Sequence, residues 1–450
     1  MAVQFSHGVD QPCEVTLTEN QLKHSPNELK VEFKMTAGLN VRSNAFSCCA
    51  LALTLVLSVM SRGALAQTPV GQMGEPQSSA KPQQHRGVKG RGVGNDRDVV
   101  FHFSTFGDSR TDRRIKGITA QDKLYLTATA PLARMIKELN AQKSQALFFN
   151  GDMIMGYDND LTQVQRQYAY WRGMMATLME SGTYVVPVPG NHEVQMPTKG
   201  ADGQVVKYAQ PHLENIWREN MSDLILDEAR WNQIVKTPFT SFDIRNTPTP
   251  ADDHIQTDQS QLYYSFDVGK LHLAILNTDP VGADSTVVVS WLKRDFEAAK
   301  ARGVNAIVAF GHKMPYVYIP QGSTKASEDS LENATGQRDA FWNVIESFGA
   351  TYFSGHEHVY HASQPTKETG GESWQVIVGS GGSPFGIKKG ESKNPQDRMY
   401  AWADVKVHAN GSLGVKIFGF DEYMGPTLEL AHWRIQPSSR RWSSSNSNDH

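Results

Sequence analysis

The chain has 450 residues, of which 39% are hydrophobic and 20% are charged, and its formal net charge at pH 7 is −3. These fractions are typical of a soluble globular protein with room for one large domain or two. The slightly acidic balance argues against nucleic acid as the main partner, because binding to phosphate backbones requires a basic surface.

Residues 1–66 are predicted to be an N-terminal extension followed by a signal peptide. The apolar run Ala45–Met60 is shorter than the roughly 20 residues of a membrane-spanning helix. Arg42 precedes this run, and an Ala-Leu-Ala cleavage pattern ends at Ala66, as in secretory signal peptides. We therefore expect a start at Met35, cleavage after Ala66, and a secreted or periplasmic protein without a stable membrane anchor. The alternative is a retained anchor.

Low-complexity segments enclose the expected globular domain. Residues 67–98 are rich in Gly, Pro, Gln and Ser, which is typical of a flexible linker. Residues 437–450 are rich in Ser and Asn and are expected to be a disordered tail. The domain itself is therefore predicted over residues 99–436.

Within these limits, short apolar runs alternate with longer amphipathic segments, which is the pattern of strands alternating with helices. The predicted strands are Val99–Phe106, Ala146–Phe149, Tyr184–Val188, Leu271–Leu276, Ala306–Phe310 and Thr351–Phe353. The predicted helices are Leu124–Asn140, Leu161–Glu180, Val287–Lys300 and Ala340–Phe348. Such alternation predicts a largely parallel sheet with helices on its faces.

The last third has a different pattern, in which turns with Gly or Asn replace the long helices. Its apolar runs Ser373–Val378, Ala401–Val407 and Leu413–Phe420 predict antiparallel strands and allow a second sheet. The stretch 195–261 is polar and is interrupted by several prolines. It is expected to be an insertion beside the functional site.

Five apolar runs are followed at once by potential metal ligands, each introduced by a glycine. The motifs are Gly107-Asp108, Gly151-Asp152, Gly190-Asn191-His192-Glu193, Gly311-His312 and Gly355-His356-Glu357-His358. Open α/β sheets place ligands at the carboxyl ends of their strands, so these loops are expected to converge. Glycine allows the backbone to turn sharply there, so that a short side chain reaches the cleft.

Aspartates, an asparagine and histidines form a mixed set of oxygen and nitrogen ligands, without the thiolates of structural zinc sites. Such a set suits divalent or trivalent transition metals such as Mn, Fe or Zn. Six ligands from separate loops exceed the needs of one tetrahedral ion, so two ions are expected. Two ions about 3.5–4 Å apart polarise a phosphoryl group and generate hydroxide at neutral pH. Phosphate ester hydrolysis is the natural chemistry of this arrangement.

With these motifs the sequence resembles the calcineurin-like metallophosphoesterase superfamily, and in particular its purple acid phosphatase-like branch. The motifs of that superfamily run GD, GD, GNHE or GNHD, a lone His, and GHxH, and the resemblance covers Val99 to about Asp421. It implies an α/β/β/α sandwich, in which central β-sheets are flanked by helices. The metal site is implied at the C-terminal ends of the strands.

The resemblance also implies a role for each motif residue. Six residues would hold the metals: Asp108 and His358 the first ion, Asp152 both ions, and Asn191, His312 and His356 the second ion. His192 would contact the phosphate and protonate the leaving oxygen. Glu193 would orient His192.

The chain departs from the family pattern in two places. Many relatives have a histidine two residues after the first aspartate, where this chain has Arg110, so one ligand of the first ion is unaccounted for. Arg110 is expected either to bind the substrate phosphate or to be an ordinary surface arginine. Met155 stands where purple acid phosphatases have their iron-binding tyrosine. Tyr157 lies two residues further on and is expected to pack, so a tyrosinate-iron site is doubtful.

The sequence thus predicts an exported binuclear-metal-dependent phosphoesterase that acts through metal-bound hydroxide on a small phosphorylated substrate or a phosphoprotein. Monoesters are favoured. The alternatives are a phosphodiesterase or nucleotidase, and a non-catalytic module that keeps its metals and binds phosphate. Tyr316, His212 and Trp217 are the first candidates for contact with substrate. The Gly-rich run 379–384 is expected to be a close-packed turn beneath the site.

Overall fold

The computed structural model describes residues 98–199, 202–321, 330–331 and 335–437, together with two short strands near the N-terminus, β1 Ala2–Phe5 and β2 Cys13–Thr16. The chain divides into two compact units, Met1–Gln83 and Gln84–His450. In the first unit, β1 and β2 pair antiparallel. Among the residues that the structure describes, no helix combines the length and apolarity needed to span a membrane. The predicted signal peptide and its cleavage position, the linker and the C-terminal tail fall almost entirely outside the described residues and stay predictions.

The second unit contains two large β-sheets. The strands of the first are β3 Val99–Phe106, β4 Ala146–Asn150, β5 Tyr184–Val188, β15 Met399–His408, β16 Leu413–Asp421 and β17 Leu428–Ile435. The strands of the second are β8 Phe239–Thr240, β9 Tyr264–Val268, β10 Leu271–Ile275, β11 Ala306–Phe310, β12 Thr351–Ser354, β13 Tyr360–Ser363 and β14 Gln375–Val378. Their orders are β17-β16-β15-β3-β4-β5 in a six-stranded sheet and β13-β14-β12-β11-β10-β9-β8 in a seven-stranded sheet.

Each sheet combines a run of parallel strands with antiparallel strands beside it. Strands β3, β4 and β5 run parallel, as do β10, β11, β12 and β14. The antiparallel strands predicted in the last third are found as β15 and β16, which extend the first sheet next to β3. The predicted strand Ser373–Val378 is different, because β14 pairs parallel to β12 and takes β13 as its antiparallel neighbour.

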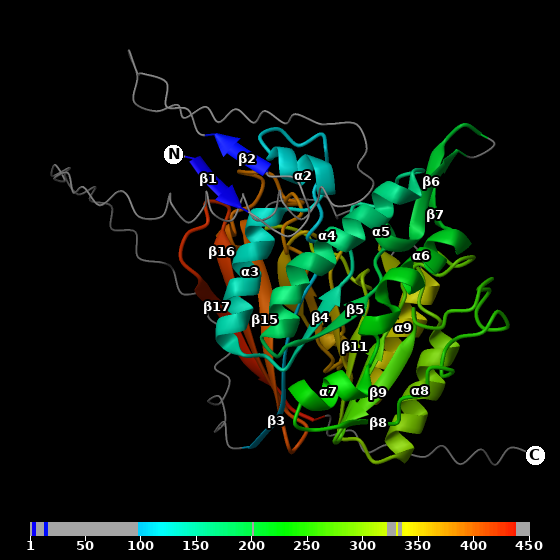
Figure 1. Ribbon diagram of the computed structural model, residues 1–450. Helices are drawn as coiled ribbons and strands as arrows, with labels where there is room; N and C mark the ends of the chain where they lie inside the picture. The colour runs from blue at the N-terminus through cyan, green and yellow to red at the C-terminus, as the bar shows by residue number, and fades with distance from the viewer. Residues whose placement is uncertain are drawn as a thin grey trace, which may run out of the picture. The chain divides into compact units, whose positions relative to one another are not determined.

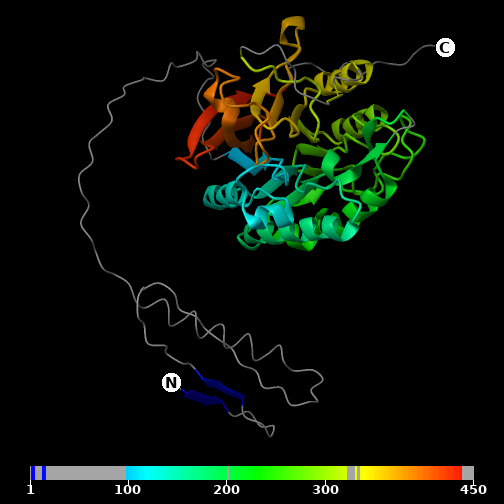
Figure 2. The same ribbon diagram turned by 90° about the horizontal axis from the view of Figure 1, so that it is seen from above.

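Helices cover the outer faces of both sheets, which confirms the α/β/β/α sandwich. Helices α3 Thr129–Gln142 and α4 Leu161–Glu180 pack their apolar faces against the six-stranded sheet (Figure 1). Helices α8 Val289–Ala301 and α9 Thr335–Phe348 form a separate core with the outer face of the seven-stranded sheet. Figure 2 shows α3, in cyan, and α9, in yellow, on opposite sides of the strands.

The two sheets pack face to face through aromatic side chains. The rings of Phe148 on β4 and Phe310 on β11 are stacked with their centroids 4.0 Å apart. Phe103 on β3 contacts both Phe310 and Phe353 edge-on. Such buried aromatic pairs contribute about 0.5–1.5 kcal/mol beyond the area they bury. This layer of aromatic rings packs β3 and β4 of the first sheet against β11 and β12 of the second.

The predicted helix Leu124–Asn140 is wrong in its first part, which folds as a separate short helix, α2 Ala120–Tyr125. Leu126 ends α2 with a left-handed φ of 54°. The carboxylate of Asp122 accepts the backbone N–H of Thr129 over 3.1 Å, so the break is stabilised by a side chain. The apolar pattern of the sequence continues across this break, so the pattern alone does not predict it.

The stretch 195–261 forms regular structure on the main body of the unit. It contains the hairpin β6 Gln195–Lys199 and β7 Val205–Ala209, then α6 Pro211–Met221, a 3₁₀ turn Ser222–Leu224 and α7 Glu228–Ile234, and finally the edge strand β8. Trp217 of α6 and Trp231 of α7 are fully buried in the core of the six-stranded sheet. The segment therefore contributes to the core as well as lying beside the predicted site.

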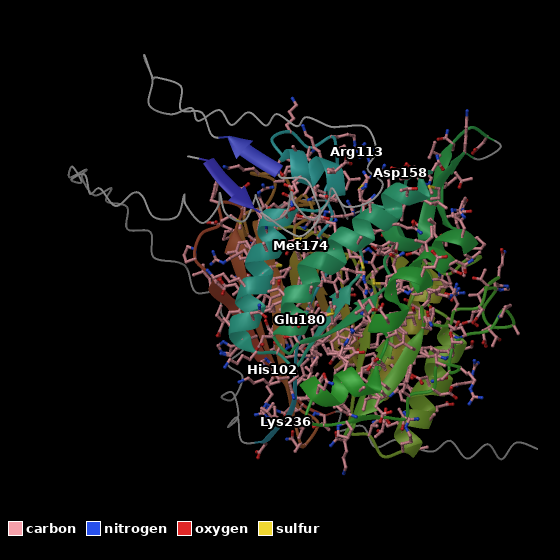
Figure 3. The ribbon with its side chains drawn as sticks, viewed as in Figure 1. His102, Arg113, Asp158, Met174, Glu180 and Lys236 are labelled. Atoms are coloured by element: carbon pink, nitrogen blue, oxygen red, sulfur yellow. The ribbon has the colours of Figure 1, made fainter. Side chains whose placement is uncertain are left out.

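The loops that follow β3 and β4 meet at the surface. Arg113 in the first loop and Asp158 in the second form an ion pair with 3.6 Å between Nη2 and Oδ2 (Figure 3). Because parallel neighbours end at the same edge of a sheet, loops that are far apart in the sequence lie side by side there.

Candidate metal centre

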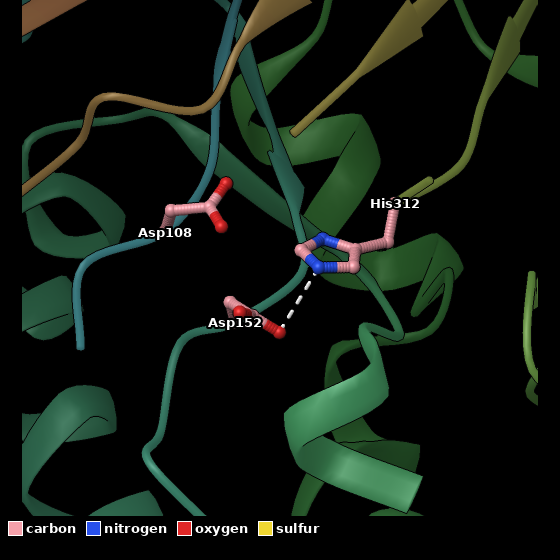
Figure 4. Close-up of side chains that lie close together, drawn as sticks. All are labelled: Asp108, Asp152 and His312. Carbon is pink, nitrogen blue, oxygen red and sulfur yellow. Dashed lines mark ion pairs between the residues drawn. The ribbon is translucent and has the colours of Figure 1, made fainter. Parts of the chain in front are cut away.

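The predicted ligands all follow the C-terminal ends of strands in the two sheets. Asp108 follows β3, Asp152 follows β4, Asn191 begins the short helix α5 Asn191–Val194 after β5, His312 follows β11, and His356 and His358 follow β12. The first four are buried and the last two are half-buried. Figure 4 shows the side chains of Asp108, Asp152 and His312 directed toward one another from three different strands.

Four ligand atoms converge at the position predicted for the second ion. Oδ1 of Asn191 lies 3.0 Å from Nε2 of His312 and 3.0 Å from Nδ1 of His356. The two ring nitrogens are 3.1 Å apart. Oδ1 of Asp152 lies 3.1 Å from Nε2 of His312. Loops after four strands in two sheets thus bring their polar atoms to one point.

The oxygens of Asp152 and Asn191 and, in the neutral ring, Nε2 of His312 are acceptors of hydrogen bonds. Nδ1 of His312 donates to the backbone oxygen of Asn150 over 2.7 Å, so in the neutral ring Nε2 carries only a lone pair. Nδ2 of Asn191 donates to the hydroxyl of Tyr157, which leaves Oδ1 as the free acceptor. Acceptors that face one another require a cation between them. The residues therefore fit a transition metal with oxygen and nitrogen ligands.

In the metal-free protein, a proton on His312 supplies part of this positive charge. Burial lowers the pKa of His312, but the carboxylates of Asp152 and Asp108 outweigh this effect and raise the pKa to about 9. A metal ion would replace this proton, because a ligating histidine must be neutral.

Asp108 also requires a cation. Its Oδ2 accepts the backbone N–H of His356 over 3.0 Å, but its buried Oδ1 has no hydrogen-bond partner in the described part of the chain. Burial raises the pKa of Asp108 well above its usual value. One ligand atom from each of Asp108, Asp152 and His312 lies within 4.8 Å of the others, so one ion could contact all three.

Three predicted ligands adopt a left-handed backbone. The φ angles are 66° at Asp108, 54° at Asp152 and 68° at His356. A residue other than glycine in this region costs about 1–3 kcal/mol, and such strain is concentrated at functional sites. In the loops of Asp108 and His356 the left-handed turn thus falls on the ligand itself, whereas in the third loop both Gly151, with a φ of 79°, and Asp152 adopt it. Gly355 serves close approach, because a Cβ there would lie 2.4 Å from Oδ2 of Asp108.

Arg110 lies inside the predicted centre. Its Nε donates to Oδ2 of Asp152 over 2.8 Å, and its Nη2 lies 3.3 Å from Nε2 of His358. Nη1 lies 3.9 Å from the sulfur of Met155. The side chain is 15% exposed, so it keeps limited access to a ligand in the cleft.

His192 lies beside the ligands but is not one of the converging atoms. Its ring Nδ1 donates to the backbone oxygen of Met155, which leaves Nε2 with the lone pair. Nε2 is 3.7 Å from Oδ2 of Asp152. Burial, followed by the charge of Arg110, lowers the pKa of His192 well below its usual value. The ring of Tyr157 packs against it with centroids 4.0 Å apart.

Glu193 has a different role from the predicted one. Its carboxylate accepts the backbone N–H groups of Gly190 and Asp152, both over 2.8 Å, and that of Ile154 over 3.1 Å. These contacts tie the loop after β4 to the loop after β5. Glu193 therefore fixes the backbone around two ligands and does not contact the ring of His192.

The Gly-rich run after β14 is confirmed as a close-packed turn at the site. The N–H of Ser383 donates to the oxygen of Asp108 over 2.8 Å, and Ser383 Oγ donates to the oxygen of Arg110 over 3.0 Å. The backbone oxygen of Pro384 accepts Nδ1 of His358 over 2.6 Å. This loop supports Asp108, Arg110 and His358 together.

The predicted substrate contacts occupy different surroundings. Trp217 is fully buried and its indole N–H donates to the oxygen of Gln261 over 3.0 Å, so that prediction is wrong. The ring of Tyr316 packs edge-on against Trp342 at 5.5 Å, next to α9. His212 is exposed on α6. Contacts of Tyr316 and His212 with substrate stay predictions.

Sequence reasoning did not identify several polar residues next to the ligands. Lys313 follows His312 directly, is fully buried, and donates to Oδ1 of Asp279 over 2.8 Å. Lys207 on β7 lies with Nζ 4.8 Å from the centre of the Tyr157 ring. Only the position of Lys313 next to a ligand was visible in the sequence. The approach of Lys207 depends on the hairpin.

Solved structures with a similar arrangement include several phosphatases. A purple acid phosphatase, PPD1, from yellow lupin (Lupinus luteus) seeds is 13% identical, with a TM-score of 0.47, and the match covers 76% of this chain and 54% of the lupin chain. This chain thus spans about half the length of the lupin protein. A dimetal phosphatase from Danio rerio is 13% identical, with a TM-score of 0.42, and the match covers 76% of this chain and 100% of that one.

GAP50, the anchor in the inner membrane complex of Plasmodium, is 11% identical, with a TM-score of 0.41 and coverage of 76% of this chain and 90% of that one. No curated protein sequence matches the chain. The family model for the calcineurin-like phosphoesterases matches residues 128–360, which is more than half of the chain and includes five of the six predicted ligands. The chain therefore belongs to the calcineurin-like phosphoesterase family.

Proposed function

We propose that this protein is an exported phosphatase that hydrolyses phosphate monoesters with the help of bound metal. The observation that carries the proposal is the convergence of His312 and His356 on Oδ1 of Asn191, with 3.0 Å from that atom to each histidine nitrogen, while Oδ1 of Asp152 lies 3.1 Å from Nε2 of His312. When bound there, the metal supplies a Lewis acid that polarises a phosphoryl oxygen and acidifies water.

The chain's own residues supply the remaining functions. Arg110, held by Asp152, places a guanidinium at the centre with 15% of its side chain exposed to a phosphate oxygen. His192 acts at the leaving oxygen through Nε2, because its Nδ1 is committed to the oxygen of Met155. The pKa of His192 is lowered in the absence of substrate, and the negative charge of a bound phosphate would raise it, so that Nε2 could carry the proton that the leaving oxygen needs. Tyr157 positions both the amide of Asn191 and the ring of His192.

The preference for monoesters is supported by the positive charges around the predicted leaving group. Beyond the effect of burial, the charge of Arg110 acts on His192 and lowers its pKa, and Lys207 lies over the ring of Tyr157 that packs against His192. A monoester dianion carries more charge than a diester and gains more from these cations. A phosphodiesterase or nucleotidase, and a phosphate-binding module without catalysis, are the alternatives.

Metal identity and number belong to the same proposal. The ligand set suits Mn, Fe or Zn. The residues at the second position fit an ion, whereas the first position contains the guanidinium of Arg110 between Asp152 and His358.

Export and partners rest on the sequence. The Ala45–Met60 run and the cleavage pattern ending at Ala66 support a secreted or periplasmic protein without a stable membrane anchor. The partner is a small phosphorylated substrate or a phosphoprotein, and nucleic acid binding is not expected from a net charge of −3. Mass spectrometry of the exported chain should find its N-terminus at Gln67, and an intact N-terminus would contradict cleavage.

The experiment that tests the activity compares p-nitrophenyl phosphate with bis-p-nitrophenyl phosphate, using the full chain with Mn²⁺, Zn²⁺, iron or chelator. Faster turnover of the monoester supports the proposal. Faster turnover of the diester would favour a phosphodiesterase. Silence on both substrates, with metal demonstrably bound, would favour the binding module.

A further inference from the structure

We propose that the centre holds one metal ion, and that the guanidinium of Arg110 occupies the position of the predicted first ion. This proposal rests on the proposed function, which identifies the centre as a metal site. It specifies which positively charged groups the centre holds. The first position was predicted to be held by Asp108, Asp152 and His358, and Arg110 contacts two of these three residues.

The guanidinium uses the same lone pairs that an ion would need. Nε of Arg110 donates to Oδ2 of Asp152 over 2.8 Å, and Nη2 lies 3.3 Å from Nε2 of His358. The other ring nitrogen of His358 lies 2.6 Å from the oxygen of Pro384 and must carry the hydrogen. A transition metal binds such oxygen and nitrogen atoms at about 2.0–2.2 Å. It would therefore have to stand where the N–H groups of Arg110 now point.

Arg110 is built into this position through its backbone. Its N–H donates to the oxygen of Asp152 over 3.3 Å, and its oxygen accepts the hydroxyl of Ser383 over 3.0 Å. It also forms an isolated antiparallel bridge with Thr127. The third nitrogen, Nη1, faces the sulfur of Met155 at 3.9 Å. If the guanidinium of Arg110 left the centre, it would lose its ion pair with Asp152. It would keep its positive charge, because it cannot be deprotonated.

The remaining ligands are enough for a single ion. Asp108, Asp152 and His312 each bring one ligand atom into a group within 4.8 Å. Asn191 and His356 add their atoms at 3.0 Å from each other. Oδ1 of Asp108 lies 3.6 Å from Nε2 of His358, has no hydrogen-bond partner among the described residues, and is available as a further ligand atom.

The charges favour the same arrangement. The carboxylates of Asp108 and Asp152 balance one divalent ion, so that the guanidinium provides the excess positive charge for a phosphate group. A second divalent ion beside the guanidinium would be repelled by it, and this repulsion is strong in a site shielded from water.

Metal uptake tests the proposal without any measurement of hydrolysis. The full chain is stripped with chelator and titrated with Mn²⁺ by calorimetry, and bound metal is counted by elemental analysis. We expect one ion per chain in the wild type and two in Arg110→His, because the imidazole removes the charge and adds a ligand. The matched control is Arg113→His, whose side chain is 57% exposed and which should keep one ion. Electron paramagnetic resonance should show an isolated Mn²⁺ in the wild type and coupled ions in Arg110→His.

Two ions bound by the wild type would overturn the proposal and leave the proposed function intact. If the wild type binds no ion, the metal dependence of the function fails as well. Circular dichroism verifies that each variant folds. If Arg110→His does not fold, the number of ions bound by Arg110→Ala, which removes the guanidinium without adding a ligand, tests the proposal instead. Uptake of a second ion by either folded variant supports the proposal, and a single ion in every folded variant overturns it.

Discussion

Oδ1 of Asn191 lies 3.0 Å from Nε2 of His312, although the two residues follow strands of different sheets and are 121 positions apart. Asn191 donates from its amide to Tyr157, and His312 donates from Nδ1 to Asn150, so both facing atoms are acceptors when the imidazole is neutral. The structure thus directs two lone pairs at one point, and the predictions below depend on a metal ion at that point.

Asp152→Ala should remove metal and activity together. This residue brings Oδ1 to 3.1 Å from His312 and also holds Arg110, so its loss should weaken metal binding by more than the roughly 10- to 100-fold typical of outer-shell partners. The control is Asp158→Ala, which removes a carboxylate that pairs with the surface residue Arg113 at 3.6 Å and accepts the backbone N–H of Asp160 over 3.0 Å. Full metal content in folded Asp152→Ala would refute the assignment of this ligand.

His192→Ala should keep the metal and lose most of the activity. The ring does not join the converging ligand atoms, and a positioned general acid typically contributes about 10²- to 10⁴-fold to the rate. Elemental analysis and steady-state kinetics on p-nitrophenyl phosphate measure both effects. His432→Ala, at an exposed position on β17, is the control. A folded His192→Ala protein with the wild-type rate would remove His192 from the mechanism.

Tyr157→Phe should weaken metal binding without abolishing it. The change removes the hydroxyl that accepts Nδ2 of Asn191, so the amide is free to rotate and present the wrong atom to the ion. Outer partners of this kind are typically worth about 10- to 100-fold in metal affinity. Calorimetric titration with Mn²⁺ measures the loss, with Tyr170→Phe as control because that hydroxyl contacts Gln121 and Thr129 instead. Equal affinities for the two variants would exclude a positioning role for Tyr157.

The stability of the fold should decrease with rising pH because of His272 on β10. This buried ring lies 2.7 Å from Asp267 and 2.8 Å from Asp295. Burial lowers the pKa of His272, but its hydrogen bonds to the two carboxylates outweigh this and raise the pKa above its usual value. Its stabilisation is therefore complete below the unfolded pKa of about 6.5 and is lost as pH rises through the folded pKa.

His272→Gln should therefore flatten the pH dependence of the thermal unfolding midpoint above about pH 6.5. It should also lower the free energy of unfolding at the lower pH by about 3 kcal/mol, because two buried carboxylates lose their shared partner. His432→Gln, at an exposed position on β17, should change neither quantity. An unchanged pH slope in His272→Gln would show that this ion pair does not control the dependence.

Strands and helices with strong periodicity were predicted well from the sequence. Val99–Phe106, Leu161–Glu180 and Ala306–Phe310 match β3, α4 and β11 residue for residue, because each is bounded by residues that cannot continue its pattern. The break at Leu126 and the parallel pairing of β14 were missed. The break is stabilised by the nearby side chain of Asp122, a contact that the apolar pattern does not contain. The direction of β14 depends on β12, which is a separate strand of the sheet.

The metal centre was predictable because its ligands directly follow the strands. The converging position of Asn191, His312 and His356 required only the rule that parallel strands end at one edge. The position of Arg110 could not be predicted by this rule, because a side chain two residues after Asp108 can point either to solvent or to the centre. Backbone contacts with Asp152 and Ser383 decide its direction, and these are visible only in three dimensions.

The most direct test of metal-dependent phosphoester hydrolysis is removal and return of the metal on one preparation of the full chain. Hydrolysis of p-nitrophenyl phosphate should disappear after chelation and return with Mn²⁺ or Zn²⁺ in proportion to the metal bound, while Asp152→Ala treated in the same way should not recover. Hydrolysis that survives complete removal of metal would contradict the central role of the centre built around Asn191 and His312.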